Sequence, residues 1–190
     1  MLLSTTMKNI IFLLILSFSM LANAAWRENE RRIDTNLEVS YYNNIGSRFI
    51  KTQTNIIALK MGGIETLGVE PKRGPAEFFS VNHVDDYLAH IAKYMEWEAK
   101  ASKNKDALTK EIGEAPTPMT GIRLKFGFHS GNANAHYLTI ISCVKIFGSC
   151  SAEKQEPQYY AIEDAKELAL LLTKLKNGEI KSGDVASEYQ

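Results

Sequence analysis

Residues 121–147 read GIRLKFGFHSGNANAHYLTIISCVKIF, and this stretch decides the fold. Its first part alternates, with apolar residues at the even positions of 122–128 and Arg123 and Lys125 between them. Small and polar residues at 130–134 are typical of a turn. The second part is apolar at consecutive positions, as expected for a strand buried on both faces. The stretch therefore predicts an antiparallel hairpin whose second strand is central in a sheet.

The segments on either side extend this hairpin into a sheet with helices. A second hairpin is expected from strands at 36–42 and 47–60, an edge strand at 157–162, and helices at 83–103, 105–112 and 163–176. Strands in adjacent hairpins with helices between them predict the α+β class. We expect an antiparallel sheet of about five strands, made of two hairpins plus an edge strand and covered by two or three helices. The alternative is a two-layer sheet structure with fewer helices.

Residues 61–81, MGGIETLGVEPKRGPAEFFSV, interrupt this pattern with four glycines and two prolines. Such a composition argues against one regular element, so a long ordered loop is expected. Its Gly62-Gly63 pair lacks the spacing of a phosphate-binding loop. The loop is a candidate rim of a binding site, because long loops in compact domains are often functional.

The first 26 residues, MLLSTTMKNIIFLLILSFSMLANAAW, have the features of a secretory signal peptide. Lys8 precedes an apolar run at 10–21, and the small residues at 22–24 follow it. The run is shorter than the roughly 20 residues that span a bilayer, which favours cleavage over a retained anchor. We therefore expect residues 1–24 to be removed and the protein to be periplasmic or secreted.

The rest of the chain is predicted to be one domain. Residues 25–178 are long enough to bury a continuous core. Residues 179–190 are polar and are expected to form a flexible tail. We expect no membrane insertion once the signal peptide is removed.

The two cysteines, Cys143 and Cys150, are predicted to form a disulfide. In an oxidising compartment two cysteines usually pair. Their C-x6-C spacing is not the C-x-x-C of redox motifs, and two thiols alone are a poor start for a zinc site. A redox role and a metal site are the alternatives. A structural disulfide carries no information about activity.

The charge balance limits the kinds of partner. The chain has 22 basic and 22 acidic residues, a formal net charge of zero. A nucleic-acid-binding domain normally presents a strongly basic face. The composition therefore argues against nucleic acid and is compatible with a protein partner.

The helix expected at 83–103 carries the most informative pattern. Its core side is predicted to consist of Val84, Leu88, Ile91 and Met95. Beside that arc lies a second stripe, made of His83, Asp86, Tyr87, His90, Tyr94 and Trp97. Aromatic side chains supply much of the energy of protein contacts, so Tyr87, Tyr94 and Trp97 are candidate binding anchors. The alternative is an amphipathic border packed under neighbouring chain.

The polar members of this stripe are candidate metal ligands. Asp86 is three residues from His83 and four from His90, so the three side chains can share one side of the helix. His83 and His90 are two helical turns apart, about 10 Å along the axis, which is too far for one ion without rearrangement. The sequence identifies no further ligand, so we predict no cofactor.

His129 and His136 are the candidate catalytic residues. They flank the predicted 130–134 turn and are expected to lie opposite each other at the mouth of the hairpin. The alternative is that both are polar strand ends. Ser130 does not occupy the nucleophile position of a G-x-S-x-G elbow.

Two functions remain open from the sequence. The first is an exported interaction module that acts by binding a protein partner, as an inhibitor, immunity protein or envelope accessory factor. The second is a small metal- or histidine-dependent hydrolase of the cell envelope. The lack of a convincing catalytic set favours the binding module over an enzyme.

Overall fold

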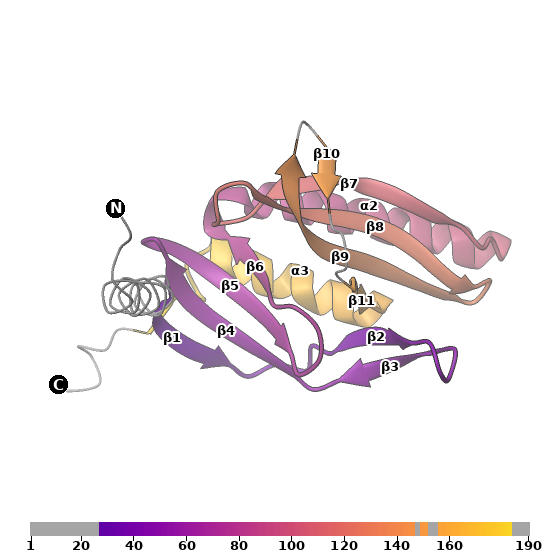
Figure 1. Cartoon of the computed structure of the whole chain (residues 1–190), viewed down its shortest axis with the longest axis horizontal. Helices are drawn as coiled ribbons and strands as arrows, with labels where there is room; N and C mark the ends of the chain where they lie inside the picture. Colours follow the sequence, from indigo (N-terminus) through magenta and orange to yellow (C-terminus); the bar gives the residue numbers. More distant parts are fainter. Residues whose placement is uncertain (1–26, 147–148, 152–155, 184–190) are drawn as a thin grey trace, which may run out of the picture.

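The computed structural model describes residues 27–146, 149–151 and 156–183 (Figure 1). The predicted signal peptide at 1–24 lies outside these residues. Within them the chain forms two antiparallel sheets with two α-helices packed against them, so the predicted α+β class is confirmed.

The strands are divided between two sheets, where the sequence predicted one. The smaller sheet has the order β1-β4-β5-β6 and consists of β1 (Glu28–Ile33), β4 (Thr54–Met61), β5 (Ile64–Pro71) and β6 (Glu77–Ser80). The larger sheet has the order β3-β2-β11-β9-β8-β7, with β10 paired to β9. Its strands are β2 (Val39–Asn43), β3 (Arg48–Thr52), β7 (Thr109–Pro116), β8 (Ile122–Asn132), β9 (Ala135–Ile146), β10 (Ser149–Ser151) and β11 (Gln158–Tyr160).

Both helices lie behind the strands in the view of Figure 1. A 3-10 turn, η1 (Val81–His83), leads into α2 (Val84–Asn104), and α3 is Ile162–Lys176. Helix α2 packs on β7, β8 and β9, whereas α3 contacts β9, β11 and also β5 of the smaller sheet. The helices therefore join the two sheets around one core.

The two strongest sequence patterns are confirmed. In β8 the alternating residues Leu124, Phe126 and Phe128 are buried. The leucines of α3 are buried as predicted, namely Leu168, Leu171, Leu172 and Leu175. Gly178, with φ of 72°, follows the end of α3, where a left-handed residue is favourable.

The predicted loop at 61–81 is wrong, because this segment forms β5 and β6. Gly62 and Gly63 have φ of 58° and 80° and connect β4 to β5 as a two-residue turn. Two positive φ angles are what a type I′ hairpin turn requires, and glycine adopts them without strain. Gly68 lies within β5, where a Cβ atom would stand 2.7 Å from Ile57 Cγ1. The glycines therefore mark a turn and a close strand contact.

The predicted helix at 105–112 is also wrong, because Thr109–Pro116 forms β7, paired with β8. Helix-forming residues such as Lys110 and Glu111 lie here on an edge strand, where pairing outweighs local propensity. Gly113 sits at an irregularity in this pairing, and the His90 ring covers it.

Two further strand predictions need correction. The strand expected at 47–60 is split at Gln53 into β3 and β4, which belong to different sheets. The expected edge strand is β11, and it is internal: Tyr159 pairs with Ser40 of β2 on one side and Thr139 of β9 on the other.

The first part of the predicted tail packs on the domain. Ile180 is buried, and the Gly183 N–H donates to the Asn29 carbonyl at 2.6 Å. The Glu65 carboxylate accepts from the Ser182 N–H at 2.7 Å and from its hydroxyl at 2.9 Å. The packed domain thus reaches at least Gly183.

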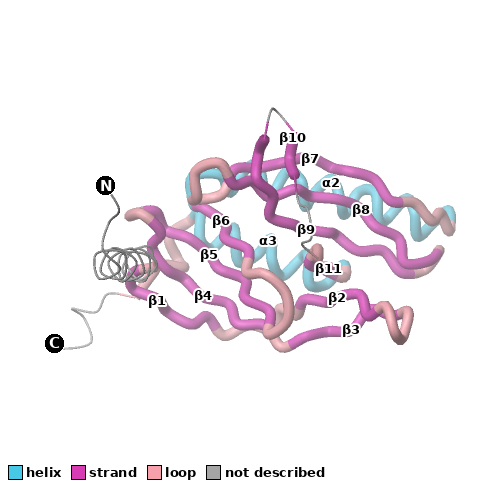
Figure 2. The backbone as a smooth tube through the Cα atoms, in the orientation of Figure 1, coloured by secondary structure: helices cyan, strands magenta, loops and turns pink. Residues whose placement is uncertain are grey.

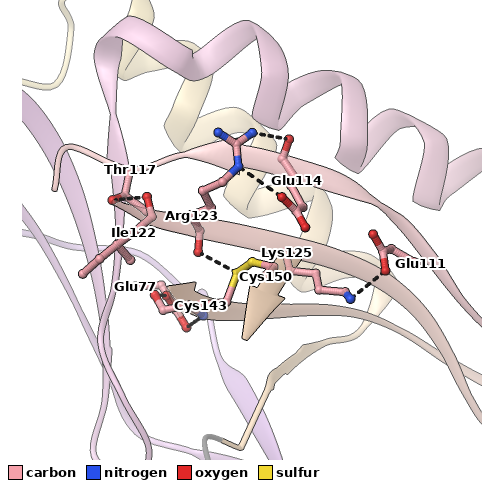
Figure 3. Close-up of a disulfide and its surroundings, with 10 residues drawn as sticks. Glu77, Glu111, Glu114, Thr117, Ile122, Arg123, Lys125, Cys143 and Cys150 are labelled. Atoms are coloured by element: carbon pink, nitrogen blue, oxygen red, sulfur yellow. Dashed lines mark hydrogen bonds and ion pairs between the residues drawn. A yellow bond between two sulfur atoms is a disulfide. The ribbon is translucent and has the colours of Figure 1, made fainter. Parts of the chain in front are cut away.

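The predicted disulfide is confirmed. Cys143 of β9 and Cys150 of β10 are bonded, with their Cα atoms 5.4 Å apart (Figure 3). The bond links two antiparallel, paired strands. Such a bond is consistent with an oxidising compartment.

Candidate functional site

The candidate site is a cleft of about 510 Å³ at one end of the larger sheet. It opens between the β2–β3 and β8–β9 hairpins, whose tips lie at the same end of the molecule in Figure 2. We call it the aromatic cleft, because its lining includes the rings of Tyr42, Phe49, His129, Tyr137 and Tyr159. Its polar lining comes from Ser47, Arg48, Ser130 and Asn132.

The short strand β11 explains why the two hairpins leave a cleft. It joins β2 through the single pair Tyr159–Ser40, and it pairs with β9 over only three residues. The β2–β3 hairpin is therefore bonded to the rest of the sheet near its base. Toward their tips the hairpins are separate, and side chains line the space between them.

Phe49 of β3 is the central side chain of the cleft. Its ring centroid lies 4.2 Å from that of Tyr137, 4.9 Å from Tyr159 and 5.1 Å from Tyr42. The ring also covers Gly131, where a Cβ atom would stand 2.7 Å from Phe49 Cε2. Phe49 thus bridges the two hairpins and forms an aromatic platform that is still partly exposed.

Of the residues that the structure describes, Arg48 is the only charged one that lines the cleft. His129 is half-buried, its Nδ1 lies 2.9 Å from Thr109 Oγ1, and burial lowers the pKa of its imidazole. Burial also raises the pKa of Tyr137 and Tyr159, which keeps both hydroxyls protonated at neutral pH. The cleft is therefore aromatic, rich in hydroxyl and amide groups, and positive at neutral pH.

Two of the six residues of the helical stripe lie in the core. Tyr87 and Tyr94 are fully buried, so the prediction that they anchor a partner at the surface is wrong. The Tyr87 hydroxyl accepts from the Ser80 N–H and donates to the Pro116 carbonyl, and Tyr94 donates to the His136 carbonyl at 3.2 Å. With their hydroxyls paired, both tyrosines can enter the core without an unsatisfied polar group.

Trp97 alone among the three predicted anchors reaches the surface. It packs on Phe128 and lines a hollow of about 250 Å³. The Nζ atoms of Lys93 and Lys110 lie 5.1 Å and 5.2 Å from the centre of its indole. A binding role for Trp97 stays a prediction.

The predicted metal ligands do not converge. His83 Nδ1 lies 3.7 Å from Asp86 Oδ2, but His90 Nε2 faces the Glu114 carbonyl at 3.3 Å and its ring packs against Phe126. Among the described residues, no group of three or more His, Cys, Asp or Glu side chains is placed to hold a metal ion. The two-turn spacing of the histidines separates them.

His129 and His136 lie on opposite faces of the sheet, so the prediction that they face each other is wrong. His129 lines the aromatic cleft, whereas His136 is buried and stacks on Phe128. His136 Nδ1 is instead 2.9 Å from the Ser130 Oγ, which accepts the Leu108 N–H at 3.1 Å. His136 Nε2 has no hydrogen-bond partner in the described part of the chain. A serine–base pair is thus present without a third group to orient the base.

A buried carboxylate joins the two sheets. Glu77 of β6, which Figure 3 shows near the disulfide, accepts hydrogen bonds from the Ser142 N–H of β9, at 3.0 Å, and from the Ser142 hydroxyl. Burial raises the pKa of Glu77 to about 7, while the Ser142 hydrogen bonds oppose this rise. No basic side chain among the described residues pairs with this carboxylate. Glu77 therefore titrates near neutral pH.

Comparison with known proteins gives no relative from which a role for the cleft can be taken. No family model, curated protein or solved structure matches the chain. None of the helices among the described residues is long and apolar enough to cross a membrane.

Proposed function

We propose that this protein is an exported interaction module, periplasmic or secreted, that binds a protein partner through the aromatic cleft. Its role would be that of an inhibitor, immunity protein or envelope accessory factor. The observation that carries the proposal is the aromatic platform around Phe49, which lines an open cleft and stays partly exposed. Partly exposed aromatic rings in a depression are typical anchors of protein contacts.

The tip of the β2–β3 hairpin supports the same proposal. Ile45 is fully exposed there, beside the cleft residues Ser47 and Arg48. The Asn43 carboxamide accepts the Ile45 and Gly46 N–H groups, which fixes the shape of the turn. A preorganised turn that presents an apolar side chain costs little ordering entropy on binding.

Phe49→Ala is expected to weaken partner binding about tenfold, because it removes the ring on which the other cleft side chains pack. The partner would be captured from the envelope and medium of the producing organism, purified, and titrated by calorimetry against wild type and variants. Phe78→Ala is the matched control, because Phe78 is a partly buried ring of the smaller sheet. Equal affinity of wild type and Phe49→Ala would contradict the proposal.

The Ser130–His136 hydrogen bond favours a second candidate, a small histidine-dependent hydrolase. Ser130 is a lining residue of the cleft, but its hydroxyl is held by His136 on the other face of β8, so a substrate would have to approach it from that face. On this candidate a fluorophosphonate probe labels the wild type, labelling is lost in Ser130→Ala, and Ser47→Ala at the same cleft keeps it. A wild type that is not labelled removes the candidate.

A further inference from the structure

Arg48 has a guanidinium group free to bind an anion at the edge of the aromatic cleft. Its side chain is exposed and follows the turn, with Nε 3.5 Å from where a Cβ atom of Gly46 would lie. In the described part of the chain, the arginines that make ion pairs are Arg27 and Arg123. The planar guanidinium suits two-point recognition of a carboxylate.

The other residues that line the cleft also favour a negatively charged ligand. Within the described part of the chain no carboxylate lines the cleft; Glu156 lines a separate hollow that shares Tyr42 and Tyr159 with it. The remaining polar groups are hydroxyls, a carboxamide and the His129 imidazole, all without negative charge at neutral pH. An anionic group entering the cleft therefore meets one cation in the lining and, among the described residues, no lining carboxylate.

We infer that the partner inserts an aromatic side chain beside a carboxylate, with the ring against Phe49 and the carboxylate on Arg48. This inference rests on the proposed function, and it specifies the chemistry of the segment that the cleft accepts. Phe49 and Tyr137 offer ring faces and edges to an incoming aromatic group. Arg48 and Phe49 both line the cleft, so one short segment can reach both.

Two matched peptides test the inference with defined probes. They are acetyl-Ser-Phe-Glu-Ser-amide and acetyl-Ser-Phe-Gln-Ser-amide, which differ only in the charge of one side chain. Amide chemical shifts of the ¹⁵N-labelled full chain, with its disulfide intact, report both the affinity and the residues perturbed. We expect the Glu peptide to bind the wild type about fivefold more tightly than the Gln peptide, the preference of one exposed ion pair.

The variants assign this preference to single side chains. Arg48→Gln should bring the two affinities together, Phe49→Ala should weaken both, and Arg32→Gln, at an exposed arginine of β1, should change neither. Equal binding of the peptides to wild type would overturn the inference, as would shifts that avoid the cleft. If phenylacetate binds more tightly than the Glu peptide, the cleft takes a free small acid. That result would overturn the inference that a segment of a protein occupies it.

The two proposals fail in different ways. If the peptides bind equally but Phe49→Ala weakens both, the charge inference fails and the cleft stays a recognition site. If the Glu peptide is preferred but Phe49→Ala leaves partner binding unchanged, the proposed function fails and the charge preference stands. The dispersion of the amide spectrum of each variant shows whether it has folded.

Discussion

Glu77→Gln is expected to stabilise the protein at pH 8 by about 3 kcal/mol and to change its stability little near pH 4.5. Glu77 is buried, and its carboxylate accepts hydrogen bonds only from Ser142, with no cation beside it among the described residues. A carboxylate in this setting is costly to ionise. Glutamine keeps both contacts, with its carbonyl accepting the Ser142 N–H and its amide donating to the Ser142 hydroxyl.

The sign of the pH dependence follows from the two pKa values of Glu77. The unfolded chain releases this proton near pH 4.5, whereas the folded protein holds it until about pH 7. Between these values the unfolded state binds fewer protons, so stability falls as pH rises. The wild type loses this stability between about pH 4.5 and 7, and Glu77→Gln does not.

Urea unfolding of both proteins from pH 4 to pH 8 measures this difference. The free energies should diverge with rising pH and then run parallel above about pH 7. Glu179→Gln, at an exposed glutamate, is the control and should show no such divergence. Glu77→Ala should be less stable than Glu77→Gln at every pH, because it leaves the Ser142 N–H without an acceptor. A difference between wild type and Glu77→Gln that stays constant with pH would contradict the prediction.

The fold could be predicted from the sequence where one local pattern settled the structure. The alternation in β8 and the leucine spacing of α3 each specify an element without reference to the rest of the chain. The pair Gly62-Gly63 did not specify its structure in this way, because a glycine pair is compatible with both a loop and a tight hairpin turn. The turn is favoured because β4 pairs with β5 along eight residues. A short stretch of sequence around the two glycines does not include both of these strands.

The candidate site was harder to predict because separate segments assemble it. Tyr42 and Phe49 come from one hairpin, His129 and Tyr137 from another, and Tyr159 from β11. The sequence of β9 is apolar at consecutive positions and does not single out Tyr137, whose contact with Phe49 depends on how the hairpins lie around β11. The stripe on α2 was a stronger local signal, yet tertiary contacts buried two of its three predicted anchors, Tyr87 and Tyr94.

The side of α2 that faces the core differs from the predicted side, which explains why Tyr87 and Tyr94 were wrongly predicted to be surface anchors. The expected core arc ran through Val84, Leu88, Ile91 and Met95, whereas the fully buried positions include Val84, Tyr87, Ile91 and Tyr94. Hydropathy alone ranks tyrosine below leucine and methionine as a core residue. In the folded protein each tyrosine hydroxyl finds a backbone carbonyl, so the larger rings fill the core and Leu88 and Met95 lie at its border.

Tyr94→Ala is therefore expected to cost about 4 kcal/mol of unfolding free energy, whereas Trp97→Ala should cost about 1 kcal/mol. The first removes a fully buried ring next to Phe128 and leaves a cavity; the second truncates a side chain that is already partly exposed. Tyr94→Phe separates ring from hydroxyl: it should cost about 1 kcal/mol, because the His136 carbonyl loses its donor. Urea unfolding at one pH measures all three. A larger loss for Trp97→Ala than for Tyr94→Ala would contradict this placement of α2, because Trp97 and not Tyr94 would then be the more deeply packed ring.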